Sequence, residues 1–255
     1  MFQQLFNLTG KTSLVTGASS GLGRAIATAY AKSGAKVIAL GRSHQKLNEL
    51  SKESDQFILK NIDITDKDAI KNMMHDIESE NIKIDILVNS AGIGKKSPIF
   101  EDKDNQTFEK TYEINVTALW NMTSIIANHM KNHKIAGSII NIASINGANC
   151  LRPELSAYAS SKAAVLQMTK ALVGELSPYN IRINSISPGL FHTPLTDYKL
   201  HNTELKSQQA KNIPLGFVPD PIEIAGSALF LASNNASKYV TGSCITIDGG
   251  NSWGG

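Results

Sequence analysis

A tyrosine and a lysine lie four positions apart in the run YASSK at residues 158–162. The surrounding residues have a helical pattern, so Tyr158 and Lys162 lie one turn apart on the same helix face. A phenol with an ordinary pKa near ~10 is a poor base at neutral pH. An ammonium group about 4 Å away, at an effective dielectric constant of ~20, offers ~4 kcal/mol, or roughly 3 pKa units. The pair therefore predicts a tyrosine that donates or accepts a proton near pH 7.

The position of Ser144 supports a catalytic interpretation of this pair. The spacing alone is also typical of two side chains on a surface helix. Ser144, however, lies 14 residues before Tyr158, directly after the apolar run 139–142. In open α/β sheets, ligands bind at such strand ends. The three residues together therefore predict an active site.

A glycine-rich turn follows the first apolar run, in the sequence TGASSGLG at residues 16–23. Gly17 permits a tight turn, Gly21 lets the backbone approach a phosphate, and Gly23 allows close packing of helix on strand. The N–H groups and dipole at the helix start favour a pyrophosphate. The alternative is a purely structural strand-to-helix turn. The cofactor contacts predicted in this turn are Gly17, Ser19, Ser20, Gly21, Leu22 and Gly23.

The end of the second apolar run indicates which dinucleotide is bound. An acidic residue there binds the ribose 2′-hydroxyl of NAD, whereas an arginine accommodates the 2′-phosphate of NADP. Residues 40–43 read LGRS, so the acid is missing and Arg42 offers a guanidinium fork suited to a phosphate. The alternative is that Arg42 is a solvated residue that caps the following helix. The sequence favours NADP(H), with NAD(H) still possible.

The elements that position these residues alternate along the chain. Apolar runs predict strands at 13–16, 36–40, 57–61, 84–89, 137–142, 182–187 and 244–247, and amphipathic patterns predict helices at 22–33, 43–53, 66–80, 105–133, 156–178 and 221–233. Nearly continuous apolar strands are typical of a parallel sheet covered by helices. We therefore expect the α/β class: one Rossmann domain over 1–255, with a doubly wound parallel sheet of about seven strands and helices on both faces. The irregular segment 188–220 is predicted to be a substrate lid.

Size and charge exclude other classes of protein. With 255 residues, 42% hydrophobic and 18% charged, the chain fits one large soluble domain. The net charge is +3, and the longest basic run is Lys95 and Lys96, which argues against nucleic acid; this pair either lies in a solvated loop or touches an anionic substrate. No apolar run reaches the roughly 18 residues of a membrane span, and the start lacks a signal-peptide pattern. We expect a cytoplasmic protein without a membrane partner.

The cysteines and histidines do not predict a metal site. Cys150 and Cys244 form no CxxC motif, and each is expected to be a small buried hydrophobe. His129 and His133 have the i, i+4 spacing of zinc ligands, but no glutamate lies between them in HExxH order and no third ligand is evident. We expect solvated histidines at a helix end, and no metal.

In combination, these segments resemble the short-chain dehydrogenase/reductase family over nearly the whole chain. The matching pieces occur in the family's order and spacing: TGASSGLG at 16–23, Asp63 in IDITD, NSAG at 89–92, Asn115, Ser144, YASSK at 158–162, and Pro188-Gly189 with Thr193. NSAG departs mildly from the more usual NNAG. Relatives suggested by the resemblance are the 3-oxoacyl-(acyl carrier protein) reductases and the gluconate 5-dehydrogenase-like members.

The resemblance implies roles for four catalytic residues. Tyr158 is the general acid in carbonyl reduction and the base in the reverse oxidation. Lys162 lowers the pKa of Tyr158 and holds the nicotinamide ribose hydroxyls. Ser144 donates a hydrogen bond to the oxyanion that develops on the substrate. Asn115 holds a water molecule that passes protons from Lys162 to solvent; its alternative role is an amide that satisfies backbone groups in a helix.

The resemblance also implies further cofactor contacts. Asp63 hydrogen-bonds the adenine amino group, or else is a helix-capping or turn carboxylate. Asn89 is at the end of the fourth strand, where the adenosine ribose is expected to lie, and its alternative role is mainly structural. The remaining contacts expected are Ile64, Ala91, Gly92, Pro188, Gly189 and Thr193.

The expected function is an NADP(H)-preferring oxidoreductase that transfers a hydride between nicotinamide and a carbonyl or secondary alcohol. The substrate is a small molecule, either a 3-oxoacyl thioester or a sugar or polyol such as gluconate. One alternative is an NAD(H)-dependent alcohol or polyol dehydrogenase of the same family. Another is a dinucleotide-binding sensor or scaffold without turnover. Apolar residues on 105–133 and 156–178, Trp120 among them, exceed what one sheet face needs, and the family resemblance implies a homotetramer.

Overall fold

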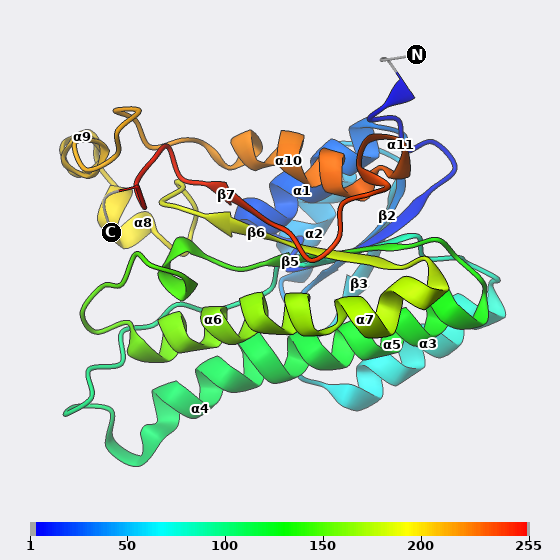
Figure 1. Ribbon diagram of the computed structural model, residues 1–255, viewed down its shortest axis with the longest axis horizontal. Helices are drawn as coiled ribbons and strands as arrows, with labels where there is room; N and C mark the ends of the chain where they lie inside the picture. Colours follow the sequence, from blue (N-terminus) through cyan, green and yellow to red (C-terminus); the bar gives the residue numbers. More distant parts are fainter. Residues whose placement is uncertain (1–3, 254–255) are drawn as a thin grey trace.

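The chain folds around a seven-stranded sheet with helices on both sides (Figure 1). The computed structural model describes residues 4–253, so residues 1–3 and 254–255 of the predicted domain lie outside the described part. The strands are β1 (Thr12–Thr16), β2 (Lys36–Gly41), β3 (Phe57–Asn61), β4 (Ile86–Asn89), β5 (Ser138–Ile142), β6 (Arg182–Pro188) and β7 (Cys244–Ile247). Their order is β3-β2-β1-β4-β5-β6-β7, and every pairing is parallel. The predicted doubly wound α/β fold is confirmed.

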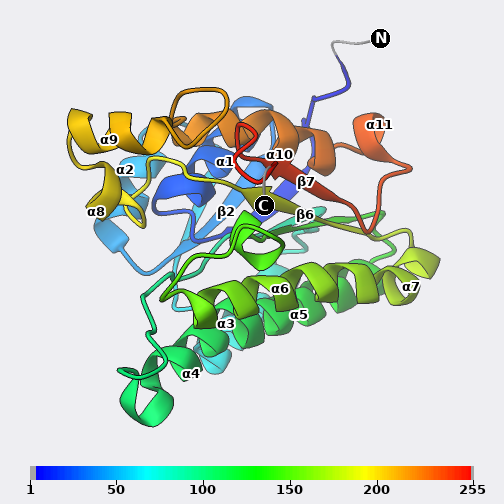
Figure 2. The same cartoon turned by 60° about the vertical axis from the view of Figure 1, so that its left-hand side comes forward.

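Two helical layers bury the two faces of the sheet (Figures 1 and 2). On one face lie α1 (Gly21–Lys32), α2 (His44–Ser51) and α10 (Ala225–Ala232); on the other lie α3 (Lys67–Ser79), α5 (Leu119–Asn132) and α6 (Ser156–Ala171). Successive strand residues point to opposite faces, so Val15 packs in the first core cluster and its neighbour Leu14 in the second. This alternation explains why the strands are apolar at nearly every position.

The two longest predicted helices are interrupted. The expected helix 105–133 consists of α4 (Gln106–Tyr112), a π-helical segment η3 (Glu113–Ala118) and α5. The expected helix 156–178 divides into α6, α7 (Val173–Leu176) and the 3-10 turn η5 (Ser177–Tyr179). Hydrophobic periodicity does not reveal a π turn, because one inserted residue barely disturbs the pattern. The other short elements are η2 (Lys103–Asn105), η4 (Ile145–Gly147), η6 (Pro221–Ile224) and α11 (Asn234–Ser237).

The segment predicted to be an irregular lid contains two helices. They are α8 (Asp197–Leu200) and α9 (Thr203–Ala210), and a small apolar cluster of Leu200, Ile213 and Val218 holds the segment together. Both helices lie at one end of the molecule, where the chain continues after β7 (Figure 1). The segment therefore has a small core of its own beside the cleft end of the sheet.

The prediction that both cysteines are buried is wrong. Cys244 is exposed and Cys150 is half-buried, and both thiols are free. Cys244 lies on β7, which is an edge strand with one neighbour and leaves side chains partly open to solvent. Within residues 4–253, no helix is both long enough and apolar enough to cross a membrane.

Candidate active site

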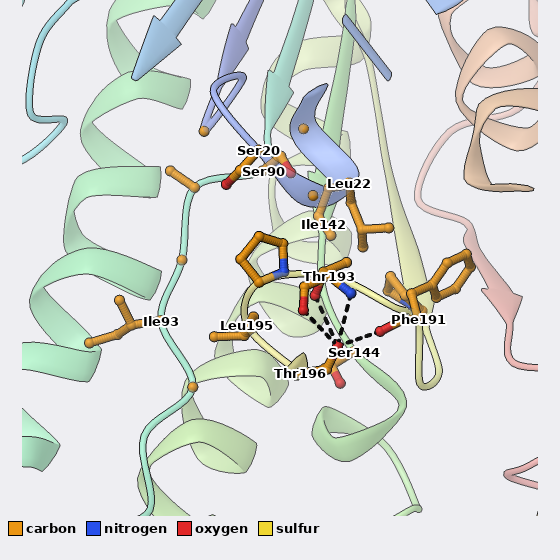
Figure 3. Close-up of a pocket in the computed structure, with 18 of the residues that line it drawn as sticks. Ser20, Leu22, Ser90, Ile93, Ile142, Ser144, Phe191, Thr193, Leu195 and Thr196 are labelled. Atoms are coloured by element: carbon orange, nitrogen blue, oxygen red, sulfur yellow. Dashed lines mark hydrogen bonds between the residues drawn. The ribbon is translucent and has the colours of Figure 1, made fainter. Parts of the chain in front are cut away.

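One cleft lies at the carboxyl ends of β1 to β6. Figure 3 shows Ser20, Ser90, Ser144 and Thr193 around it, contributed by four different parts of the chain. The predicted site residues that line it are Gly17, Ser19, Ser20, Gly21, Leu22, Gly23, Arg42, Asp63, Ile64, Ala91, Gly92, Ser144, Tyr158, Lys162, Pro188, Gly189 and Thr193. Asn89 and Asn115 are not among the lining residues of the described chain. Residues separated widely in sequence thus form one site.

Neighbouring backbone atoms leave no room for a side chain at Gly17 and Gly23 of the glycine turn. Gly17 has φ +70°, and a Cβ there would lie 2.9 Å from the backbone of Ala91. A Cβ at Gly23 would collide with the carbonyl oxygen of Gly17. Ser20 is the N-cap of α1 but makes no side-chain capping bond. The first N–H groups of α1 therefore remain without a side-chain cap at the cleft, which fits a phosphate-bearing cofactor.

Arg42 and Asp63 line the cleft beside the ends of β2 and β3, where the adenosine is predicted to lie. Arg42 Nη1 is 3.8 Å from Asp63 Oδ2, and the two side chains are 68% and 41% exposed. Asp63 Oδ1 accepts hydrogen bonds from the backbone N–H (2.9 Å) and hydroxyl (2.8 Å) of Thr65. Burial acts to raise the pKa of Asp63, but these bonds and the charge of Arg42 lower it overall. Asp63 therefore has the turn-forming contacts of its alternative role, while its adenine contact stays a prediction.

The helix after β2 is capped by Ser43, not by Arg42. The Ser43 hydroxyl accepts the backbone N–H of Lys46, and the Arg42 side chain lines the cleft instead. Lys46 also lines the cleft and places a second cation in the first turn of α2. Lys46 was not among the residues predicted from the sequence, although its position one helical turn beyond Arg42 is a signal for it.

Three of the four predicted catalytic residues, Ser144, Tyr158 and Lys162, meet in the cleft. Ser144 follows β5 and is the N-cap of η4, where its Oγ accepts the N–H of Asn146 at 3.2 Å. Tyr158 and Lys162 lie one turn apart on α6. Lys162 Nζ lies 5.9 Å from the centroid of the Tyr158 ring and donates a 2.7 Å hydrogen bond to the carbonyl oxygen of Ile142. A hydrogen bond also joins the Tyr158 and Ser144 side chains.

Burial, and not the charge of Lys162, has the largest effect on the pKa of Tyr158. Burial raises the pKa of Tyr158 above its ordinary value, and the hydrogen bond with Ser144 acts against this rise. Burial likewise lowers the pKa of Lys162 to about 8. The expected lowering of the Tyr158 pKa is therefore wrong for this structure. The Lys162 ammonium is bound to Ile142, and taking a phenol out of water disfavours its anion.

Asn115 holds the loop after β4 against α6. It lies fully buried on η3; its Oδ1 accepts the N–H of Ile93 at 2.9 Å, and its Nδ2 donates to the carbonyl of Ile93 at 2.9 Å and to Ser161 Oγ at 3.0 Å. A Cβ at Gly92 would lie 3.1 Å from Asn115 Oδ1 and 3.6 Å from Lys162 Nζ. The side-chain contacts match the alternative role, and the water relay stays a prediction.

Asn89 lies behind the cleft. Its Nδ2 donates to Thr123 Oγ1 and to Asn141 Oδ1, both at 2.9 Å, and so links β4 to α5 and β5. The predicted cofactor contact of this side chain is therefore not supported, because its donors serve buried partners. Thr16, which the sequence analysis gave no role, accepts the N–H groups of Ser90 and Ala91 at 3.1 Å. It joins the end of β1 to the end of β4.

The start of the lid segment packs on the glycine turn. A Cβ at Gly21 would lie 3.4 Å from the Cβ of Thr193, and one at Gly189 would lie 2.7 Å from the Cβ of Asp248. Thr196 Oγ1 accepts the N–H of Thr193 at 3.0 Å and donates to the carbonyl of Phe191 (Figure 3). These bonds hold the chain in a tight turn directly beside the cofactor-binding loop.

A family model described as enoyl-(acyl carrier protein) reductase matches residues 17–252, a span that includes the three glycines of the turn and the predicted catalytic residues. The chain belongs to the short-chain dehydrogenase/reductase family. It is therefore an NAD(P)-dependent dehydrogenase or reductase, as the sequence analysis predicted.

Three relatives of this family member differ in substrate and cofactor. The 3-oxoacyl-[acyl-carrier-protein] reductase of Thermotoga maritima is 37% identical over 250 residues, covering 95% of this chain and 98% of the relative. A gluconate 5-dehydrogenase from Burkholderia cenocepacia, solved with NADP and tartrate, has a TM-score of 0.89 at 28% identity and covers 98% of both chains. A 4-hydroxyisoleucine dehydrogenase solved with NADH has a TM-score of 0.89 at 33% identity and covers 96% of this chain and 100% of the relative.

The cleft of this dehydrogenase/reductase also contains residues that no motif pointed to. A Cβ at Gly147 would lie 2.5 Å from the backbone of Lys162, so this glycine lets the loop after Ser144 approach α6. Arg152, Tyr198 and Lys199 also line the cleft. Arg152 lies in the loop between η4 and α6, and Tyr198 and Lys199 lie on the short helix α8, in a segment that the sequence predicted to be irregular. Only the tertiary structure brings them to the site.

A second cluster, away from the cleft, consists of Glu78, His129 and His133. The prediction of solvated histidines is wrong for His129, which is 3% exposed. Its Nε2 accepts the N–H of Ile84 at 3.1 Å, so its Nδ1 has the proton and donates to Glu78 Oε1 at 2.6 Å. His133 Nε2 lies 2.7 Å from Glu78 Oε2. The polar groups satisfy one another and join α3 to α5, and Nδ1 of His129 has no lone pair for a metal.

Proposed function

We propose that the enzyme is an NADP(H)-preferring oxidoreductase that transfers a hydride between nicotinamide and a carbonyl or secondary alcohol, with Tyr158 as the acid or base. One observation carries this proposal: Ser144, Tyr158 and Lys162 converge in a cleft whose opposite wall is the glycine turn. The non-catalytic sensor is disfavoured because a sensor has no need of this set. It predicts cofactor binding without turnover of any carbonyl.

The residues divide the chemistry between them. When bound, the nicotinamide supplies the hydride in reduction and accepts it in oxidation. In reduction, the Tyr158 hydroxyl donates its proton to the carbonyl oxygen. The Ser144 hydroxyl accepts the Asn146 N–H and so keeps its own proton for the same oxygen. Because the pKa of Lys162 is about 8, its ammonium is mostly charged at pH 7 and stabilises the tyrosinate that remains.

The preference for NADP(H) rests on Arg42 and Lys46. Both line the adenosine end of the cleft, and no acidic residue ends β2. Two cations near a phosphate dianion form charge-assisted hydrogen bonds, which are stronger than neutral ones. The NAD(H)-dependent alternative lacks this support, although one relative is solved with NADH.

Two substrate classes follow from the relatives, a 3-oxoacyl thioester and a sugar acid of the gluconate type. The experiment is a panel of carbonyl and alcohol substrates with both cofactors, read by the absorbance of the reduced nicotinamide. We expect turnover with NADPH in excess of that with NADH. Tyr158→Phe should keep cofactor binding and lose about 10²- to 10⁴-fold in kcat. Full turnover by this variant would refute the mechanism.

We also propose that the enzyme acts in the cytoplasm as a homotetramer. Both cysteines are free thiols, which suits a reducing compartment. Trp120 and Tyr179 remain 45% and 43% exposed and line a shallow groove with Leu172 and Leu176. Exposed apolar surface of this kind favours association with another subunit.

A further inference from the structure

Arg152 lies in the loop between η4 and α6. This loop joins the catalytic Ser144 to the catalytic Tyr158, and Arg152 lines the same cleft as both of them. Its side chain is partly buried. Lys199, on α8 of the lid segment, lines the cleft as well. Two cationic side chains from different parts of the chain thus border the place where a substrate meets Tyr158.

The backbone beside Arg152 is held in place. The carbonyl of Glu154 accepts the N–H of Ser97 at 2.7 Å, and Leu155 is buried and donates its N–H to the carbonyl of Arg152 at 3.4 Å. Glu154 has a left-handed φ of 64°, an uncommon backbone for glutamate that these contacts maintain. Arg152 is therefore presented by an anchored loop.

No acidic side chain of the described chain pairs with Arg152, because Glu154 is bound to Lys96 and Asp63 lies near the other end of the sheet. The neighbouring Glu154 forms its ion pair with Lys96, across the loop after β4. Within residues 4–253, Arg152 makes no ion pair. The acid that lines the cleft, Asp63, follows β3, and β2, β1 and β4 lie between β3 and β5 in the sheet. Among the described residues that line the cleft, no acidic residue other than the distant Asp63 is available to neutralise Arg152 and Lys199.

We propose that Arg152 binds a carboxylate of the substrate, assisted by Lys199, and that the substrates are small hydroxy and oxo acids. This inference rests on the proposed function and selects the sugar-acid class over the thioester class. A guanidinium offers a planar fork of N–H donors that matches a carboxylate bidentately. A neutral thioester group beside the reacting carbonyl would give Arg152 and Lys199 no negative partner. Each charge would then remain unpaired in a partly desolvated site, which costs free energy.

The test measures binding, so it does not depend on turnover. Three acids are compared with the alcohols that have CH₂OH in place of each carboxylate: D-gluconate with D-glucitol, tartrate with threitol, and 3-hydroxybutyrate with butane-1,3-diol. Affinity is measured by calorimetry with the wild-type protein and saturating NADPH. Hydroxy acids cannot react with the reduced cofactor, so only binding is observed.

We expect at least one acid to bind about tenfold or more tightly than its neutral counterpart, the usual effect of a charge-assisted hydrogen bond. Arg152→Gln should abolish this preference, Arg152→Lys should retain part of it, and Lys199→Gln should weaken it less. Raising the salt concentration should reduce it. The matched control is Lys95→Gln, since Lys95 is exposed and does not line the cleft; this variant should bind like wild type.

The inference is overturned if no acid binds more tightly than its neutral counterpart, or if the preference survives in Arg152→Gln. Turnover of the neutral N-acetylcysteamine thioester of acetoacetate, with no acid preference, would sink the inference and leave the proposed function intact. If acids bind in a way that needs Arg152 but no carbonyl is turned over, the inference about Arg152 stands and the proposed function is refuted.

Discussion

Lys162 Nζ donates a 2.7 Å hydrogen bond to the carbonyl oxygen of Ile142, and this bond ties the catalytic helix α6 to the last residue of β5. The ammonium lies almost fully buried, and burial lowers its pKa to about 8. The cofactor-free enzyme thus keeps a charge in an unfavourable environment at neutral pH. In the proposed mechanism this charge stabilises the tyrosinate, so the proposed role of Lys162 has a cost in the stability of the fold.

This burial predicts that Lys162→Met stabilises the cofactor-free enzyme at pH 7. Below pH 8, Lys162 is charged in both folded and unfolded states, so the folded state bears the desolvation cost. Between pH 8 and the ordinary value of 10.5, the folded state loses the proton first, so wild-type stability rises with pH relative to the variant. We expect a gain of about 2 kcal/mol at pH 7, after loss of the bond to Ile142. Urea denaturation from pH 7 to 10 should show the gain shrinking; a constant gain would contradict the argument.

The adenosine end of the cleft predicts which substitutions change cofactor choice. Arg42→Ala and Lys46→Ala should each raise the KM for NADPH about tenfold, because each removes a charge-assisted contact to the 2′-phosphate. The KM for NADH should change little, since that cofactor lacks the phosphate. Lys52→Ala is the control, because Lys52 is exposed at the C-terminal end of α2 and does not line the cleft. Equal effects on both cofactors would place Arg42 outside phosphate recognition.

His129 predicts a stability defect away from the active site. His129→Ala removes a buried ring and leaves the N–H of Ile84 without its acceptor, so we expect a loss of about 2–4 kcal/mol in the free energy of unfolding. His133→Ala, the neighbouring control, breaks only a partly exposed pair with Glu78 and should cost less than about 1 kcal/mol. Chemical denaturation measures both. Similar values for the two variants would show that burial of His129 contributes nothing.

The hydrogen bond with His129 lowers the pKa of Glu78; burial opposes this, and the bond with His133 adds to the lowering. The contribution of Glu78 to stability is therefore present above its ordinary value of 4.5 and is lost as the pH falls through the lower folded pKa. The defect of His133→Ala should accordingly disappear at strongly acidic pH.

We expect the exposed groove between α5 and α7 to be part of the subunit interface of the proposed tetramer. Trp120→Glu should shift the particle from a tetramer to a smaller species in light scattering, because a charge would enter an apolar contact. Lys71→Glu, an exposed change of charge on α3, should leave the assembly intact. A wild-type monomer would contradict the tetramer proposal itself.

The sequence alone determined the parts of this protein that depend on short-range patterns. Short apolar runs and amphipathic patterns predicted all seven strands and the main helices, and the spacing of Gly17, Gly21 and Gly23 predicted the cofactor loop. Tyr158 and Lys162 were recognisable because one helical turn separates them. Such features are encoded within a few residues, so they can be predicted without knowing which distant residues surround them.

The tertiary structure alone decided what depends on long-range packing. Four features depend on neighbours from distant segments. They are the raised pKa of Tyr158, the buried hydrogen bonds of Asn89, the burial of His129 and the position of Arg152 in the cleft lining. Burial and hydrogen-bond partners set the energy of a polar or charged group, and these partners are chosen by the fold. The proposed catalytic residues could be predicted from the sequence, whereas the proposed role of Arg152 in substrate binding could be inferred only from its place in the folded chain.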